Sequence, residues 1–379
     1  MQALSKIFLL TAAGAVGIAL LGVKHASGQG AEPKPQMAED VFKNVQALRG
    51  IPPDQFMGTM GAFSAALGMS CEDCHVSGNQ DWSTYATDTP LKIRTRQMVL
   101  MMTAINKQYF GGRQGVTCYS CHRGANHPKV TPNLATLYDP TPIDNPDDTI
   151  QPAPGQLPAD QILDKYIQAL GGAQKLLGIT SFVAKGTNSG YGPEGGKRAV
   201  EIYAKAPNQR TTVIQTDNGV STTAFDGRSG WYAAPLRPIP VLTYNGADLA
   251  VLKLEAEMAF PGRIKQILGN LKVGFPVAIG DKDYTVVQGT SQAGTLTTLY
   301  FDPDTGLLAR MVRYANSVVG RFPTLIDYSD YRDVAGVKMP YHWVTSWLDG
   351  KETYDITDFQ VNVAIDAARF AKPAPPPSK

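Results

Sequence analysis

The sequence has little net charge and few cysteines. Its formal net charge at pH 7 is +2 over 379 residues, which is too small to indicate binding to nucleic acid or to an anionic membrane surface. No basic run and no interleaving of basic with aromatic residues occurs, so we exclude nucleic acid as a partner. Only four cysteines are present. None lies near the N-terminus, so no lipid can be attached to a cysteine there.

All four cysteines belong to two copies of one motif, at residues 71–75 (CEDCH) and 118–122 (CYSCH). Each copy reads C-x-x-C-H, the pattern that attaches a c-type haem. The two thiols can each bond one vinyl group of a porphyrin, and the adjacent histidine supplies an axial nitrogen to the iron. A lone C-x-x-C would also suit a structural disulfide or a zinc ribbon, but a histidine follows both copies. We therefore predict two covalently attached haems, bound by Cys71, Cys74, Cys118 and Cys121, with His75 and His122 on the irons.

Residues 1–30 have the pattern of an export signal. Lys6 gives a positive start, residues 7–23 are apolar, and Ala26-Ser27-Gly28 offers a small-residue cleavage site. The alternative is an inner-membrane anchor, because this apolar run is near the lower limit of spanning length. Glycines interrupt the run, so we expect a cleaved signal and a periplasmic protein. The periplasm is also where c-type haems are attached.

Two units of helix, loop and motif are expected in the segment that follows. After a short helix at residues 37–48, a second helix begins at Pro53 and stops at Gly68, three residues before the first motif. The same layout repeats with a helix that starts at residues 88–91 and ends at Gly111-Gly112, just before the second motif. Such a loop can fold the helix back across a haem. A methionine on the helix would then reach the sixth position of the iron and close it to substrates, which suits electron transfer.

The spacing of the methionines leaves two candidates in each unit. Met57 and Met60 share one helix face, as do Met98 and Met101. Between the motifs, Trp82 and Tyr85 are expected to pack on a porphyrin edge. His127 is expected to be a solvated loop residue rather than a ligand.

The sequence resembles the cytochrome subunit attached to the photosynthetic reaction centres of purple bacteria. The resemblance lies in Arg96-Gln97-Met98, in Ala104-Ile105-Asn106 and in residues 115–124 (GVTCYSCHRG). In that family the sixth ligand comes from the helix before each motif. The resemblance therefore implies Met98 for the second haem and Met60 for the first, with Met57 as the alternative to Met60. The family's subunit carries two such units, whereas this chain has one. In that family a histidine in the loop between helix and motif binds a more distant haem, and residues 108–114 of this chain contain no histidine.

A change of composition divides the chain. Proline recurs from residue 128 to residue 158, so this run is expected to be extended and semi-rigid. We therefore predict a di-haem domain at 36–135, a linker at 136–158 and a β domain at 159–372.

The second half shows mostly strand patterns after a helix at 160–177 that is broken by Gly171-Gly172. A helix at 249–268 interrupts the series. The expected strands are 181–183, 198–204, 209–215, 222–225, 230–232, 284–289, 296–301, 307–314, 324–332, 341–347 and 353–361. We predict an α+β chain whose small helical domain precedes a strongly curved antiparallel sheet wrapped around helices, an incomplete barrel.

This half resembles the periplasmic lipoprotein-sorting carriers and their lipoprotein-receptor relatives. The matching stretches are residues 226–231 (DGRSGW), 301–307 (FDPDTGL) and 328–340. The resemblance implies a half-open barrel that holds a hydrophobic ligand, and the alternative is a barrel filled by its own side chains. We find no catalytic constellation here, because this half has no cysteine, one histidine and no glycine loop with a lysine.

These patterns predict an electron carrier rather than a catalyst. The span between the two motifs is 118 − 75 = 43 residues, short enough to hold two haems close in one small domain. A redox donor and a redox acceptor are the expected partners. The β domain would dock a partner, bind an apolar molecule or fix the protein at an envelope surface. The alternatives are a di-haem peroxidase-like oxidoreductase with one open iron, and a lipid or lipoprotein carrier with a redox-sensing haem domain.

Overall fold

The computed structural model describes residues 35–76, 81–128, 130–132, 149–190 and 196–376. Contacts divide the chain into residues 1–35 and residues 36–379, and the description below concerns the second of these units. The predicted signal at 1–30 and residues 136–148 of the predicted linker lie outside the described residues. Within the described residues, no helix is long and apolar enough to cross a membrane.

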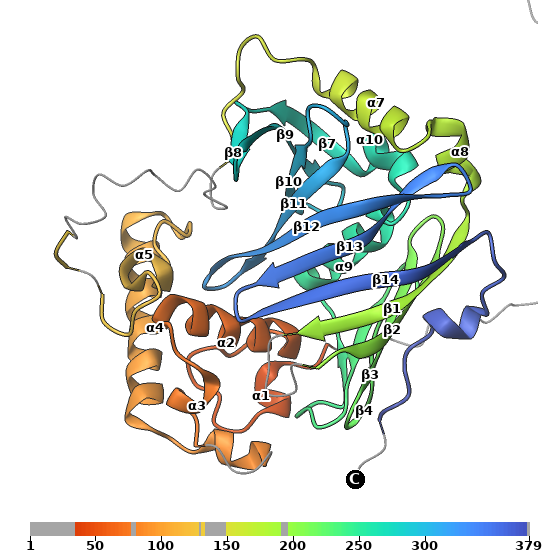
Figure 1. The fold of residues 1–379 in the computed structure, drawn as a ribbon. Helices are drawn as coiled ribbons and strands as arrows, with labels where there is room; N and C mark the ends of the chain where they lie inside the picture. The colour runs from red at the N-terminus through yellow and green to blue at the C-terminus, as the bar shows by residue number, and fades with distance from the viewer. Residues whose placement is uncertain (1–34, 77–80, 129, 133–148, 191–195, 377–379) are drawn as a thin grey trace, which may run out of the picture. The chain divides into compact units, whose positions relative to one another are not determined.

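Helices and turns build the chain up to residue 122. The elements are α1 (Ala38–Val41), α2 (Pro53–Leu67), α3 (Cys71–Cys74), η1 (Trp82–Ala86), α4 (Pro90–Tyr109) and α5 (Cys118–His122) (Figure 1). α2 begins at Pro53, and Gly68 ends it in the left-handed region with φ 62°. The Thr89 hydroxyl caps α4 by accepting a hydrogen bond from Lys92 N at 3.2 Å. The predicted bounds of α2 and the predicted start of α4 are therefore confirmed.

The predicted helix at residues 37–48 is wrong. Only Ala38–Val41 is helical, and Asn44 adopts φ 60°. The Asn44 side chain donates hydrogen bonds to Ala86 O and to Asp88 Oδ1, each at 2.7 Å. These long-range bonds hold the residue in a turn, since asparagine side chains compete with helical hydrogen bonding.

The remaining described residues are dominated by one curved antiparallel sheet of 14 strands that does not close into a barrel (Figure 1). Along its path the order is β6-β5-β4-β3-β2-β1-β14-β13-β12-β11-β10-β9-β7, and β8 pairs with β9. The strands are β1 (Ser181–Gly190), β2 (Arg198–Lys205), β3 (Gln209–Thr216), β4 (Gly219–Phe225), β5 (Gly230–Ala233), β6 (Val241–Thr243), β7 (Leu268–Val273), β8 (Val277–Ile279), β9 (Lys282–Ser291), β10 (Leu296–Phe301), β11 (Leu308–Ser317), β12 (Gly320–Val334), β13 (Val337–Trp347) and β14 (Gly350–Val361). The predicted α+β fold with a curved, incomplete barrel is confirmed.

The helices of this half differ in part from the prediction. α7 (Ala159–Ala169) and α8 (Ala173–Gly178) are separated by Gly171-Gly172, as predicted. The predicted helix at 249–268 is shorter, because α9 (Gly246–Met258) ends before η2 (Pro261–Arg263) and α10 (Ile264–Ile267), and β7 begins at Leu268. Pro261 lacks a backbone N–H, so the longer helix cannot continue through it.

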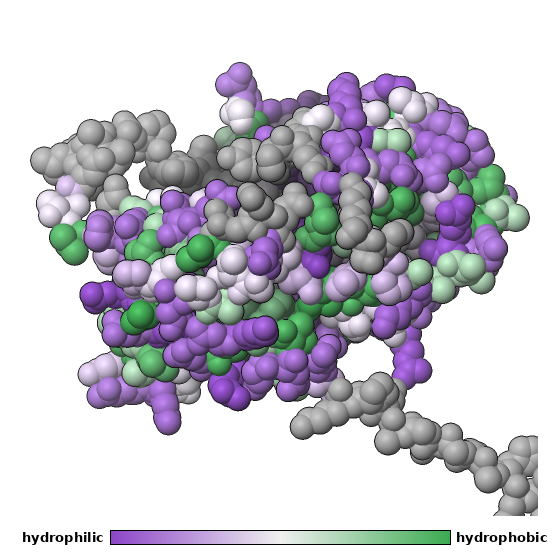
Figure 2. Space-filling view, turned by 90° about the horizontal axis from the view of Figure 1, so that it is seen from below, coloured by the Kyte–Doolittle hydropathy of each residue, from purple (hydrophilic) through white to green (hydrophobic). Residues whose placement is uncertain are grey.

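The main core lies between the sheet and the helices α7, α9 and α10. Leu163, Leu254 and Ile264 of these helices are fully buried against strand residues such as Phe301 and Met311. A smaller core joins the first helices to the turn between β11 and β12, because Val319 is buried with Ala38, Leu48, Ile51, Val99 and Met102. Seen from below, the surface mixes purple hydrophilic residues with separate green hydrophobic areas (Figure 2).

Candidate functional site

The first C-x-x-C-H motif lines a pocket. α3 carries the two cysteines, and its start is fixed by Asp73, whose carboxylate accepts hydrogen bonds from Ser70 N at 2.7 Å and Ser70 Oγ at 2.9 Å. Cys71, Cys74 and His75 share a pocket of about 440 Å³ with Met57 and Met60 of α2. The structure thus brings together the cysteines, the histidine and both methionine candidates of the first unit.

The walls of this pocket combine apolar faces with a charged rim. Aromatic and aliphatic side chains line it, among them Phe42, Phe56, Phe63, Leu67, Trp82 and Tyr85. Lys92, Arg96 and Arg237 add positive charge to the lining. A porphyrin has an apolar face and two carboxylates at its edge. The described residues therefore fit a haem, with the apolar walls on its faces and the cations available to its carboxylates.

Both motif histidines are oriented by the same kind of contact. His75 Nδ1 lies 3.0 Å from Tyr85 O, and His122 Nδ1 lies 3.0 Å from Ala125 O. Because a carbonyl oxygen only accepts, Nδ1 must carry the proton, and Nε2 then keeps the lone pair that binds a metal. Burial lowers the pKa of His75, which favours the neutral imidazole that ligation requires. The ring of Tyr85 stacks on His75 with centroids 4.6 Å apart.

The four cysteines are free thiols. Burial raises the pKa of Cys71, Cys74 and Cys118, so these groups stay protonated at neutral pH. Among the described residues, no three His, Cys, Asp or Glu side chains gather closely enough to hold a metal ion.

Hydrogen bonds of the Asn106 side chain hold the loop before the second motif against α4. This buried side chain donates to Val116 O at 2.8 Å and accepts from Gly115 N at 2.9 Å and Val116 N at 3.0 Å. The Thr117 hydroxyl then caps α5 by accepting from Ser120 N at 3.3 Å. Asn106 belonged to the resemblance found in the sequence, and its structural role is to hold the loop that enters the motif.

The end of α5 also packs against the end of α2. Gly124 N donates to Ala66 O at 2.9 Å. A Cβ atom at Gly68 would lie 2.3 Å from the carbonyl oxygen of Gly124, so this close approach requires glycine.

The methionines of α4 lie at different depths. Met98 is half-buried, Met101 is 48% exposed and Met102 is 6% exposed. Met102 Sδ lies 4.0 Å from Cys118 Sγ, and Met98 stands one turn earlier on the same side of the helix. Met102 was not singled out as a ligand from the sequence, although its spacing from Met98 would have suggested it.

The two motifs are tied to opposite ends of α4. The Thr89 hydroxyl, just before the helix, donates to Cys74 O at 2.7 Å, while Asn106 near its C-terminal end holds the loop before Cys118. At the rise of an α-helix, the 17 residues between these two anchors span about 25 Å.

Three residues of the first pocket come from turns of the sheet. Arg237 and Pro238 follow β5, and Asp349 lies in the turn between β13 and β14. The Asp349 carboxylate is so close to α2 that a Cβ on Gly61 would lie 3.0 Å from it. Trp82 Nε1 donates to Leu236 O at 2.9 Å beside them. No local pattern in the sequence marks these residues, because more than 150 positions separate them from the motif.

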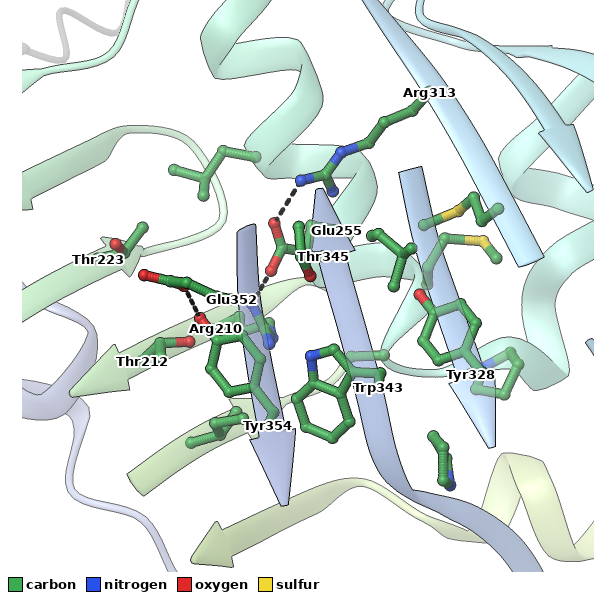
Figure 3. A pocket seen from close by; sticks show the side chains of 18 of the residues that line it. Arg210, Thr212, Thr223, Glu255, Arg313, Tyr328, Trp343, Thr345, Glu352 and Tyr354 are labelled. Carbon is green, nitrogen blue, oxygen red and sulfur yellow. Dashed lines mark hydrogen bonds and ion pairs between the residues drawn. The ribbon is translucent and has the colours of Figure 1, made fainter. Parts of the chain in front are cut away.

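A second cavity of about 560 Å³ lies on the inner side of the sheet (Figure 3). Glu255 of α9 pairs there with Arg210 of β3 and with Arg313 of β11. Burial alone would raise the pKa of Glu255, but the two arginines outweigh it and hold that pKa below its usual value. Burial, with a smaller contribution from Asp54, raises the pKa of Asp248 at the start of α9 to about 6.

Residues 22–140 match the family model of the photosynthetic reaction centre cytochrome C subunit. The photosynthetic reaction center cytochrome c subunit of Thermochromatium tepidum is 35% identical over 109 residues, which are 28% of this chain and 25% of the relative. That of Roseobacter denitrificans is 34% identical over 101 residues, 24% of this chain and 27% of the relative. The match confirms the predicted resemblance, and it spans about a quarter of the length of these curated relatives.

Similar solved structures cover the second half of the chain. A LolA superfamily protein from Nitrosomonas europaea has a TM-score of 0.40 at 15% identity and covers 57% of this chain and 99% of its own. A DUF1329 family protein from Desulfovibrio piger has a TM-score of 0.41 at 11% identity, with 57% and 98% covered. A putative outer membrane lipoprotein-sorting protein domain from Vibrio parahaemolyticus has a TM-score of 0.38 at 8% identity, with 55% and 97% covered. Proteins of the lipoprotein-sorting kind, which the sequence resembled here, are thus among the similar structures.

Proposed function

We propose that this protein is an exported di-haem c-type cytochrome that passes single electrons between redox partners. The observation that carries the proposal is the matched orientation of the two motif histidines, each with Nδ1 3.0 Å from a backbone carbonyl. This contact leaves Nε2 of both rings free for iron. The match to reaction-centre cytochrome subunits over residues 22–140 supports it independently.

Each haem, when bound, supplies an iron that gains and loses one electron. For the first haem, Cys71 and Cys74 would hold the porphyrin and His75 and Met60 would bind the iron, with Met57 as the alternative to Met60. For the second we assign Cys118, Cys121, His122 and Met98, with Met101 as the alternative. A methionine on each iron keeps small molecules off it and favours electron transfer over catalysis.

The β half would serve docking or the binding of an apolar ligand. Its inner cavity of about 560 Å³ falls within the range of about 300–1,000 Å³ typical of ligand pockets. We place the protein in the periplasm, where c-type haems are attached, with a donor and an acceptor protein as its partners.

Mass spectrometry and visible spectra of the purified protein test this function. We expect a mass increase of two haems, a weak methionine-to-iron band from both sites and no reaction of the reduced protein with carbon monoxide. Carbon monoxide binding at one iron would instead support the peroxidase-like alternative. A mass increase of one haem or none would contradict the di-haem assignment.

Methionine variants test the sixth ligands. Met60→Leu and Met98→Leu should each remove about half of the methionine-to-iron band and open one iron to carbon monoxide, because leucine keeps the volume but offers no thioether sulfur. The matched controls are Met57→Leu and Met101→Leu, which should leave both properties unchanged. If a control variant or Met102→Leu removes the band instead, the ligand assignment moves to that residue.

A further inference from the structure

The inner cavity of the sheet has apolar walls. Strands from both arms of the curved sheet line it together with α9 (Figure 3). Apolar residues on these elements include Phe182, Ile202, Met258, Met311, Ile326 and Phe359. A cavity of about 560 Å³ with such walls suits the hydrocarbon part of a ligand.

One ionic cluster stands among these apolar walls. Arg210 on β3 and Arg313 on β11 both pair with Glu255 of α9. Five strands lie between β3 and β11 in the sheet (β2, β1, β14, β13 and β12), so the curvature alone brings the two arginines together. Two guanidinium groups share one carboxylate here, which leaves one positive charge uncompensated within the cluster.

Arg313 has unused hydrogen-bond donors. Its side chain is 8% exposed, and Nη2 donates to Glu255 Oε2 at 3.1 Å. Nε and Nη1 are buried and have no hydrogen-bond partner among the described residues. A guanidinium has five N–H donors, and buried donors without partners are rare in proteins. Since Arg313 lines the cavity, a small turn of its guanidinium would bring these donors to an acceptor on a molecule bound there.

The nearby acid Glu352 is engaged elsewhere. Its Oε2 accepts a hydrogen bond from the Tyr354 hydroxyl at 2.6 Å, as the dashed line in Figure 3 marks. Trp343 stacks on Tyr354 with ring centroids 5.0 Å apart, which holds that tyrosine in place. The lining also includes a third acid, Asp248, and a further cation, Lys338. Among the charged groups of the lining, Arg313 combines burial with donors that have no partner in the described part of the chain, so the arginine pair is the part of the cavity suited to an anion.

We propose that this cavity binds a single-chain amphiphile with one oxyanion head group, a long-chain carboxylate or phosphate monoester. The head accepts hydrogen bonds from Nε and Nη1 of Arg313, and the chain lies against the apolar wall. A neutral apolar molecule would leave these donors unpaired, and a small inorganic anion would leave the apolar wall uncovered. The inference rests on the apolar-ligand role proposed for the β half and names the class of ligand.

Isothermal titration of the full-length, haem-loaded protein tests the proposal. The probes are palmitate, hexadecyl phosphate, methyl palmitate, acetate and inorganic phosphate. At least one of the two long-chain anions should bind at least about tenfold more tightly than methyl palmitate, because a hydrogen bond to a charged group contributes that much. The tighter binder of the two shows whether the preferred head group is a carboxylate or a phosphate monoester. Binding of acetate or phosphate as tight as that of the long-chain anions, equal binding of the ester, or no binding of either long-chain anion would overturn the proposal.

A matched pair of variants on β11 locates the head group. Arg313→Met should abolish the preference for the anion over the ester and leave ester binding within about twofold. Arg310→Met is the control, because Arg310 lies outside the cavity lining and pairs with Asp327. A preference that survives in a folded Arg313→Met variant, checked by circular dichroism, would overturn the assignment. If that variant does not fold, the comparison of palmitate with methyl palmitate in the unaltered protein still tests whether the cavity prefers an anionic head group. Haem content is measured separately, so a negative result here leaves the electron-transfer proposal intact.

Discussion

At the scale of single residues, the two motif histidines share an orientation although their carbonyl partners come from different surroundings. His75 meets Tyr85 O, which belongs to the following turn η1, whereas His122 meets Ala125 O only three residues ahead. Two different local structures that produce the same tautomer indicate a shared requirement at Nε2.

Histidine substitutions test that requirement. We expect His75→Ala and His122→Ala each to halve the low-spin haem absorption, because one iron loses its axial nitrogen. His127→Ala is the control, since His127 is exposed and lies in the loop after the second motif. Visible spectra of equal amounts of protein measure this absorption, and mass spectrometry of the same samples determines how many haems are attached. An unchanged spectrum in either motif variant would contradict the assignment.

The motif residues could be singled out from the sequence because covalent haem attachment needs a fixed local spacing, and their role as haem ligands stays a prediction. The methionine ligands were harder to predict, because helical spacing places several methionines on one face. Only their packing in the folded protein distinguishes one from another. The structure buries Met102 beside Cys118 and exposes Met101, a difference that depends on contacts with Val319 from the turn between β11 and β12. Such contacts leave no trace in local sequence.

At the scale of elements, Asn106 joins the second motif to α4. Replacing it with alanine removes three hydrogen bonds and leaves Val116 O and two backbone N–H groups without their partner. We expect Asn106→Ala to lower the free energy of unfolding by about 2–4 kcal/mol, measured by denaturant titration. Gln108→Ala, on the exposed side of the same helix, should change it by less than about 0.5 kcal/mol. Equal effects of the two variants would show that the clamp does not stabilise the fold.

The ion pairs of α9 give the sheet a pH dependence of defined sign. The pKa of Glu255 lies below its usual value, so its ionised form stabilises the fold at neutral pH, and this contribution is lost as the pH falls through the folded-state pKa. Glu255→Gln should therefore cost about 3 kcal/mol at pH 7 and progressively less as the pH falls below about 4.5, where the glutamate of the unfolded chain takes up a proton. The cost should vanish only below the lower folded-state pKa, where the native glutamate is itself protonated.

Glu257 provides the opposite case on the same helix. Burial raises the pKa of Glu257, with Lys253 opposing, so its ionised form does not favour folding. We expect Glu257→Gln to leave stability at pH 7 unchanged or slightly higher. Denaturant titrations of both variants between pH 3 and pH 8 compare them. If the cost of Glu255→Gln stayed constant down to pH 3, the arginine pair would not be responsible for it.

The elements themselves were predictable where their signals are local. Proline and glycine mark both ends of α2, and alternation marks the long strands, so these predictions hold. The predicted helix at 37–48 was wrong because Asn44 is held by distant partners. The strands β6 and β8 were missed because three residues are too few for a pattern. The strand β7 was missed because its six residues (LGNLKV) do not alternate between apolar and polar. The open, curved sheet could be predicted from the series of hairpins in the sequence. The approach of Arg210 and Arg313 to the same carboxylate could not, because five strands separate them in the sheet.

At the scale of the whole unit, turns of the sheet complete the first pocket. Asp349 from the turn between β13 and β14 and Arg237 from the loop after β5 both line it. The same hairpin carries Trp347 and Glu352, which line the inner cavity. One pair of strands therefore touches both cavities, and turns of the sheet contribute charged side chains to the proposed haem pocket.

Charge substitutions in these turns should move the potential of the first haem in opposite directions. A carboxylate near the iron favours the ferric state, so Asp349→Asn should raise the potential by tens of millivolts, and Arg237→Met should lower it by a similar amount. The second haem should not move, because its motif is held at the far end of α4. Spectroelectrochemical titration resolves the two potentials, and Asp217→Asn, in the turn between β3 and β4, is the control for a general effect of net charge. Shifts of the same sign in both variants, or an equal shift of both haems, would mean that the sheet acts through structure rather than through the field of these two charges.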